Sequence, residues 1–168
     1  MSEGATALNL PDLPPHLRFE RLPHTGEAFN YAFDVKRTAM GPHITARWGW
    51  DEDFQRTFHQ QRFQEKPFFR ILHDNVPVGT IALTRQPDHV LFDDFYLLPS
   101  YQRQGLGAAI LRHCLSVADE MRLPVRLRYL KWNPVGSLYR RHGFQQVGET
   151  DIHFLMERQP ARPLGESD

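Results

Sequence analysis

The sequence has one cysteine, no net charge and no long apolar run, and each shortage excludes a class of protein. Cys114 is alone among 168 residues, so an internal disulfide is excluded and a reducing compartment is expected. Twenty acidic residues cancel twenty Lys and Arg residues, so no overall field predicts binding to nucleic acid or to an anionic membrane. No run approaches the roughly 18 apolar residues that span a bilayer, and the first residues lack the pattern of a secretion signal. We therefore expect a cytoplasmic protein.

Metal-ligand spacing is also missing, because the nine histidines form no H-x-x-x-H pattern, and we expect no metal ion. What is present is the composition of an ordinary globular protein, with 40% apolar residues and twelve phenylalanines for a core. Prolines without periodicity predict a flexible N-terminal tail over residues 1–15 and a second tail over residues 159–168. Residues 16–158 are expected to form a single domain.

Hydrophobic periodicity predicts a mixed α/β (α+β) fold with one mostly antiparallel central sheet flanked by helices. Helices are expected over residues 26–44, 51–64, 105–121 and 134–143. The first should stop near Gly41-Pro42, since proline disrupts a helix interior. Strands are expected over residues 17–22, 68–73, 78–85, 89–98, 123–130, 144–149 and 152–158. The short connections "DNVP" and "QPD" predict antiparallel neighbours.

A glycine-rich turn, "QRQGLG" at residues 102–107, joins an expected strand to an expected helix. It lacks the Lys-Ser/Thr of a nucleotide-hydrolysing phosphate loop, and Ile110 stands where a dinucleotide loop needs Gly or Ala. Backbone amides at such a turn can converge on an anion, and Arg103 adds a positive charge. Gly105 and Gly107 permit positive φ and a close approach of a ligand to the backbone. The alternative is a tight connection without a ligand.

A second motif, "NPVGSLYRRHGF", runs from Asn133 to Phe144. Together the two motifs resemble the pyrophosphate loop [QR]-x-x-G-x-[GA] and the later N-P-x-x-x-L-Y-x-x-x-G-F segment of the GNAT superfamily of acyl-CoA N-acyltransferases. The resemblance extends over about residues 17–158, and "RWGWDEDFQ" at residues 47–55 is similar to one bacterial branch. It implies that a splayed pair of parallel strands holds acetyl-CoA as the co-substrate.

The resemblance also implies which residues bind CoA. A bulge in the expected strand 89–98 would let the backbone of about residues 95–98 bond the pantetheine arm and the thioester oxygen. Tyr139 would protonate the leaving thiolate, or would only pack on the sheet. Asn133 would bond the pantetheine arm, cap a helix, or do both. The implied CoA-binding residues are Leu97, Leu98, Gln102, Arg103, Gln104, Gly105, Leu106, Gly107, Ala108, Asn133 and Tyr139.

A general base is harder to find. Some relatives carry a Glu on the strand before Asn133, but residues 125–132 hold no carboxylate. Asp93 and Asp94 remain, and strand alternation lets only one of them face the cleft. We favour Asp94 as the base, with a pKa raised by burial. The alternative is a salt bridge to Arg70, Arg85 or Arg128.

The acceptor site is expected between the two early helices and the last hairpin. Trp48, Trp50, Asp51 and His153 are its candidates, and an acidic lining would suit a cationic amine. The alternatives are core or rim aromatics and helix capping. The expected reaction moves an acetyl or other acyl group from acyl-CoA to a primary amine of a small molecule or peptide, in a ternary complex. A degenerate acyl-CoA sensor or complex subunit is the alternative, and a homodimer is left open.

Overall fold

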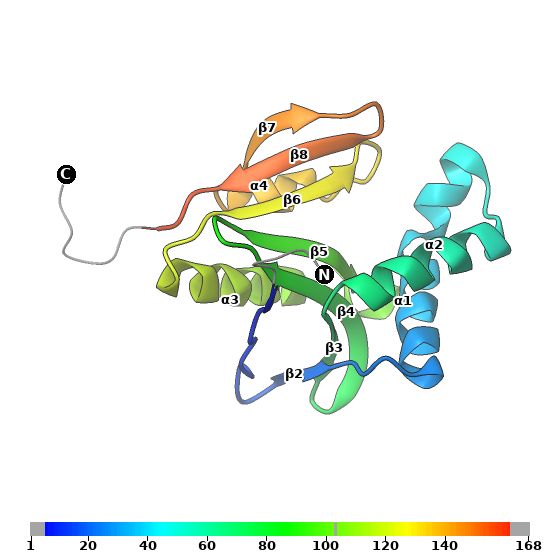
Figure 1. Ribbon diagram of the computed structural model, residues 1–168, viewed down its shortest axis with the longest axis horizontal. Coiled ribbons are helices and arrows are strands. Elements are labelled where there is room, and N and C mark those ends of the chain that lie inside the picture. Colours follow the sequence, from blue (N-terminus) through cyan, green and yellow to red (C-terminus); the bar gives the residue numbers. More distant parts are fainter. Residues whose placement is uncertain (1–5, 103, 162–168) are drawn as a thin grey trace.

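The computed structural model describes residues 6–102 and 104–161, and its described strands form one eight-stranded sheet (Figure 1). Seven strands follow the order β2-β3-β4-β5-β6-β8-β7, and β1 pairs with β4 beside that path. The strands are β1 Thr6–Ala7, β2 Leu17–Arg21, β3 Phe68–His73, β4 Val76–Arg85, β5 Val90–Leu97, β6 Val125–Leu130, β7 Gln145–Glu149 and β8 His153–Arg158. The helices are α1 Gly26–Trp48, α2 Glu52–Glu65, α3 Leu106–Glu120 and α4 Gly136–Arg141, and η1 is a short 3-10 turn at Pro99–Tyr101. The predicted fold class is confirmed.

The parallel pair β5 and β6 divides the sheet into two antiparallel halves. Only Val90↔Val125 and Leu91↔Arg126 are paired between the described residues of these strands. Beyond them the two strands spread apart toward their carboxyl ends, as Figure 1 shows. A sheet that opens in this way leaves room for a ligand between its halves.

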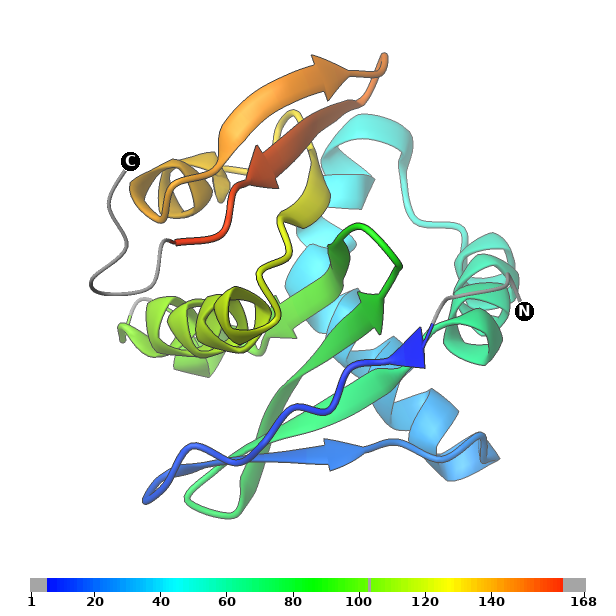
Figure 2. The same ribbon diagram turned by 60° about the vertical axis from the view of Figure 1, so that its left-hand side comes forward.

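Helices cover both faces of the β2–β5 half, and strand alternation explains which helix lies on which face. On β4, Ile81 and Leu83 belong to the cluster that includes Ile110 and Leu111 of α3. Ala82, between them, belongs to the second cluster, which includes residues of α1 and α2. Figure 2 shows α3 and α1 on opposite sides of these strands. None of the described helices is both long and apolar enough to cross a membrane.

α1 differs from the prediction because it runs through Pro42 to Trp48. Met40 and Ile44 on either side of Pro42 are both buried, so packing on the sheet side continues across the proline. The helix ends instead at Gly49, whose φ is +77° and whose amide donates to the Thr45 carbonyl. Tertiary burial here outweighs the loss of one helical hydrogen bond.

The start of β4 and the N-terminal segment also differ from the predictions. Asp74 and Asn75 have φ values of +49° and +67°, as in a two-residue hairpin turn, so β4 starts at Val76 and not at Val78. Residues 1–15 were expected to be a tail, but Thr6 and Ala7, which form β1, pair with the last two residues of β4. Leu8 and Leu10 are also buried in the core, at 1% and 3% exposure.

Candidate active site

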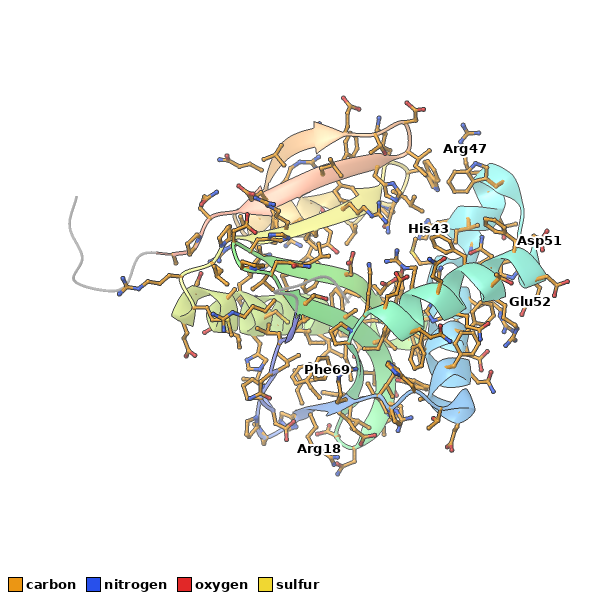
Figure 3. The ribbon with its side chains drawn as sticks, viewed as in Figure 1. Arg18, His43, Arg47, Asp51, Glu52 and Phe69 are labelled. Carbon is orange, nitrogen blue, oxygen red and sulfur yellow. The ribbon has the colours of Figure 1, made fainter. Side chains whose placement is uncertain are left out.

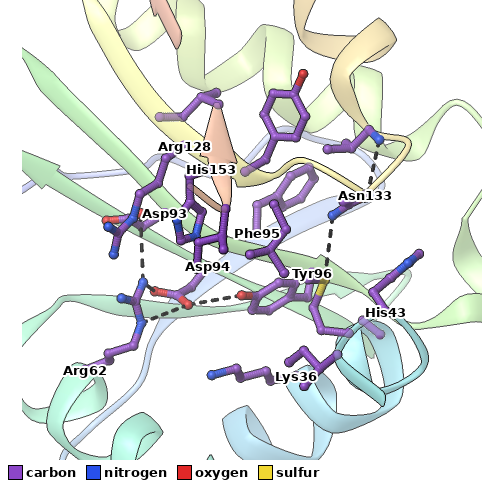
Figure 4. Close-up of a pocket in the computed structure, with 18 of the residues that line it drawn as sticks. Lys36, His43, Arg62, Asp93, Asp94, Phe95, Tyr96, Arg128, Asn133 and His153 are labelled. Carbon is purple, nitrogen blue, oxygen red and sulfur yellow. Dashed lines mark hydrogen bonds and ion pairs between the residues drawn. The ribbon is translucent and has the colours of Figure 1, made fainter. Parts of the chain in front are cut away.

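A cavity of about 860 Å³ lies where β5 and β6 separate. Residues 92–97 of β5 and 127–130 of β6 form two of its walls. The later half of α1, one side of α2 as far as Arg62, several residues between 133 and 139, and Ile152 and His153 complete the lining. Figure 4 shows part of this lining, and Figure 3 labels His43 and Asp51 near the turn between α1 and α2. We name the two ends after the ligands expected from the sequence. The acceptor end is lined by residues of α1 and α2 that include Lys36, Met40 and Arg62, and the cofactor end by Gln102 and Gly107.

A β-bulge in β5 aims several side chains into the cavity. The β4–β5 register shifts between Thr80 and Ala82, so Asp94 and Phe95 together stand opposite Ile81. Asp94 has φ +49°, the left-handed region that some types of bulge place at this position. The bulge that the family resemblance implied in this strand is therefore confirmed, at Asp94 and Phe95.

Both neighbouring aspartates face the cations of α2, although alternation predicted that only one would reach the cleft. Arg62 binds Asp94 in a bidentate manner, with Nε–Oδ1 at 3.3 Å and Nη2–Oδ2 at 2.6 Å. Lys66 Nζ lies 2.6 Å from Asp93 Oδ2. The Tyr96 hydroxyl donates to Asp94 Oδ1 at 3.3 Å (Figure 4). The bulge breaks the alternation, and that prediction was wrong.

The pKa of Asp94 also differs from the prediction. Burial alone would raise the pKa of this carboxyl, whose side chain is 1% exposed. The charge and hydrogen bonds of Arg62, together with the charges of Lys66 and Lys36, outweigh burial and hold the pKa below its usual value. A salt bridge does form, but with Arg62 and not with Arg70, Arg85 or Arg128. Asp94 is thus a paired carboxylate with weak affinity for a proton.

The cofactor end is built around the start of α3. Gly105 precedes the helix with φ +77°, and the first helical hydrogen bond runs from Ala109 N–H to its carbonyl, at 3.1 Å. The amides of residues 106–108 therefore come before the hydrogen-bonded ladder, in the position that binds anions at a helix start. Gly107 lines the cavity, and a Cβ there would lie 3.6 Å from Leu97 Cδ1.

The remaining predicted loop residues have different positions. The Gln102 side chain lines the cavity and donates to the Leu97 carbonyl at 2.8 Å, which ties the turn to the end of β5. Leu106 packs into the core and does not line the cavity. Arg103 lies outside the described residues. Four other residues are also absent from the described lining: Leu98, Gln104, Gly105 and Ala108.

Tyr139 lines the cavity from α4. It is 6% exposed, and its ring packs against Phe92, Tyr129 and Phe144 with centroids 5.7 to 6.4 Å apart. Burial raises the pKa of its phenol far above the ordinary value, so the group keeps its proton at neutral pH. Among the described residues, nothing forms a hydrogen bond with this hydroxyl, which leaves the proton available to a ligand.

Asn133 lies in the turn before α4 and lines the cavity. Its Oδ1 accepts a hydrogen bond from the Val135 amide at 3.2 Å, which fixes this turn. The N-cap of α4 is Val135, so the alternative that Asn133 caps the helix is wrong. The Asn133 Nδ2 lies 3.7 Å from Met40 Sδ and joins this segment to α1 (Figure 4). The cavity-facing position remains compatible with a bond to the pantetheine arm.

Three of the four predicted acceptor residues line the cavity: Trp48, Asp51 and His153. Asp51 Oδ1 accepts from the Phe54 amide at 3.0 Å, so it also caps α2. Trp48 packs edge to face on Trp132, and burial lowers the pKa of His153. Trp50 is not part of the lining, because its indole donates to Glu52 Oε2 at 2.6 Å.

Sequence reasoning missed the cations of the acceptor end, Lys36 and Arg62. A signal for Lys36 exists, because it shares a helical stripe with the buried residues Phe33, Met40 and Ile44. A lysine in an apolar stripe is an exception that points to a site. In the part of the chain that the structure describes, no three potential metal ligands gather in one place.

Residues 34–144 match a family model described as the acetyltransferase (GNAT) family. Among solved structures, the chain is similar to PaiA N-acetyltransferase from Thermoplasma acidophilum in complex with coenzyme A, at 19% identity and TM-score 0.67 over 85% of this chain and 98% of that one. It is also similar to the ribosomal-protein-S18-alanine N-acetyltransferase from Escherichia coli, at 17% identity and TM-score 0.63 over 90% and 99%. At these identities the likeness concerns the fold. No curated protein matches the sequence.

Proposed function

Because the chain belongs to the GNAT acetyltransferase family, we propose that it transfers an acetyl group from acetyl-CoA to a primary amine by direct attack in a ternary complex. The observation that carries this proposal is the cavity. It is lined at one end by Gly107 at the start of α3 and at the other by Arg62 on α2, which favours a cofactor and an acceptor that meet between β5 and β6.

The residues of the cofactor end fit a CoA pyrophosphate and pantetheine arm. The amides of residues 106–108 and the absent side chain of Gly107 leave a positive, open position for phosphate groups. Asn133 and the backbone around the bulge of β5 line the path that the arm would take. When bound, the thioester supplies an activated acetyl group.

Tyr139 serves as the acid in this proposal. The amine nitrogen forms a bond to the carbonyl carbon, the carbon–sulfur bond breaks, and Tyr139 gives its phenolic proton to the departing sulfur. The neutral amine loses its proton to solvent water, and the Tyr139 phenolate takes a proton back from solvent water, so that the tyrosine is restored. The base role predicted for Asp94 has little support, because Arg62 already holds the charge of that carboxylate.

Two measurements test the proposal. Isothermal titration with acetyl-CoA should give saturable heat, and the absence of heat up to about millimolar acetyl-CoA would refute CoA binding altogether. A screen of small-molecule and peptide amines, followed by free thiol release, should then find an acceptor. Binding without thiol release above background for every amine would instead support the sensor interpretation.

Three finer expectations stay predictions: the bacterial branch suggested by residues 47–55, a cytoplasmic location, and a homodimer.

A further inference from the structure

The acceptor end holds a buried lysine that forms no ion pair with the described carboxylates. Lys36, in the middle of α1, is 5% exposed and lines the cavity. Among the described residues, no carboxylate oxygen lies within 4.0 Å of its Nζ, and none accepts a hydrogen bond from it. Its Nζ lies 4.9 Å from the centroid of the Phe58 ring. Figure 4 shows the side chain below Asp94 and Tyr96, with its nitrogen on the side of Arg62.

The neighbouring charges do not cancel that of Lys36. Asp94 is engaged by Arg62, and Asp93 is engaged by Lys66. In the group of Lys36, Arg62, Lys66, Asp93 and Asp94, three cations against two anions leave one positive charge. Arg128 and Asp51 also line the cavity, and their opposite charges do not change this sum. His59, which also lies near Lys36, is neutral because burial lowers its pKa to about 4.

An uncompensated charge in a buried position is costly, and a bound anion removes much of that cost. Burial lowers the pKa of Lys36 to about 8, while Asp94 opposes the shift, so the group is still mostly charged at neutral pH. Arg62 adds positive charge near Lys36, because both side chains lie against Phe58. The Arg62 guanidinium is 5.6 Å from the centroid of the Phe58 ring.

We propose that Lys36 binds a carboxylate of the acceptor, so that the acceptor is an amine that also carries a carboxylate and an apolar side chain. One excess positive charge matches a carboxylate better than a doubly charged phosphate. Met40, Ile44 and Phe54 line the same end and would contact the apolar side chain. The inference rests on the proposed function, and it reverses the expectation of an acidic lining for a cationic amine.

Matched amines test the preference directly. Phenylalanine and 2-phenylethylamine differ only in the carboxylate, and so do leucine and 3-methylbutylamine. We expect the wild-type protein to favour the carboxylate member of at least one pair by about tenfold to 100-fold in kcat/KM, the strength of one charged hydrogen bond. Lys36→Met should bring this ratio close to one, while Lys36→Arg should keep most of it.

Lys131→Met is the matched control, because Lys131 pairs with Glu149 and does not line the cavity. It should leave the ratio unchanged. Met is close to Lys in length and apolar, so Lys36→Met is expected to fold, and circular dichroism checks this. No preference for the carboxylate member in either pair, or the same ratio in wild type and Lys36→Met, would overturn the inference.

A binding measurement separates this inference from the proposed function. In the presence of CoA, N-acetyl-phenylalanine should bind about tenfold or more tightly than N-(2-phenylethyl)acetamide, and Lys36→Met should remove the difference. Lys36-dependent binding without any acetyl transfer would refute the proposed function and leave the carboxylate site standing. Transfer to amines without a carboxylate preference would refute the site and leave the transferase standing.

Discussion

Tyr139 and Tyr129 lie ring to ring in the same cavity, yet their hydroxyl groups differ in a way that bears on catalysis. The Tyr129 hydroxyl accepts a hydrogen bond from Arg140 at 3.3 Å, whereas the described residues leave that of Tyr139 without a partner. We therefore expect Tyr139→Phe to lower turnover by about 100-fold, the lower end for a general acid, and to leave the affinity for acetyl-CoA unchanged. Tyr129→Phe should lower turnover far less.

The measurement is a single-turnover experiment, so that product release does not hide the chemical step. Titration calorimetry on both variants reports cofactor affinity. If Tyr139→Phe turns over at the wild-type rate in a single turnover, Tyr139 is not the acid and only packs on the sheet.

At the residue scale, the surroundings of Asp94 could be predicted from the sequence only in part. Its place in a central strand was predictable, because the residues around it are apolar. Its partner was not, since Arg62 lies 32 positions earlier on a helix and the two meet only after folding. The alternation rule also failed, because it assumes a regular strand and a bulge reverses it locally.

At the scale of elements, the first turn of α3 offers two neighbouring small residues with different surroundings. Gly107 lines the cavity, and Ala108 does not. A leucine at position 107 would fill the space in front of the first-turn amides, with its Cβ already 3.6 Å from Leu97. We expect Gly107→Leu to weaken acetyl-CoA binding by about 100-fold or more, the loss of roughly 3 kcal/mol of phosphate contacts.

Ala108→Leu is the matched control, since it adds a similar side chain one position along the helix. Titration calorimetry on the two variants should show the loss only for position 107. Equal affinities would mean that phosphate groups do not approach this turn.

The packing of α2 against α1 and β3 encloses a histidine in aromatic rings. His59 is fully buried, and neither of its ring nitrogens has a hydrogen-bond partner among the described residues. Phe29 and Phe33 of α1 and Phe68 of β3 lie with ring centroids 5.6 to 5.7 Å away. Burial, with a smaller contribution from Lys36, lowers the pKa of His59 from 6.5 to about 4.

This histidine should make the fold sensitive to acid. Between about pH 6.5 and pH 4 the unfolded chain binds a proton at this site and the folded chain does not, so stability is lost as the pH falls through that window. The loss amounts to about 3 kcal/mol. His59→Leu should remove this part of the pH dependence, which urea unfolding at about pH 7 and about pH 4.5 would measure. The same pH dependence in variant and wild type would mean that folding does not lower the pKa of His59.

For the whole molecule, the order of elements from residue 17 onward follows from periodicity and turn chemistry. Two features did not follow, for a shared physical reason. The two residues of β1 have no period to read, and α1 passes Pro42 because burial continues on both sides of it. Both depend on contacts between distant segments. The splay of β5 from β6 is of the same kind, and only the family resemblance anticipated it.

That splay makes the stability of the whole chain depend on what lies between the two halves of the sheet. β5 and β6 share only two paired positions in the described chain, so a ligand along both strands would add contacts where the sheet has few of its own. Acetyl-CoA at about 100 times its Kd should raise the free energy of unfolding by about 2.7 kcal/mol. For a chain of this length, the midpoint of thermal unfolding should then rise by about 5 to 10 °C. Differential scanning calorimetry should show this rise for wild type and Ala108→Leu but not for Gly107→Leu. A rise of equal size in Gly107→Leu would mean that the cofactor does not contact the start of α3 between the two halves of the sheet.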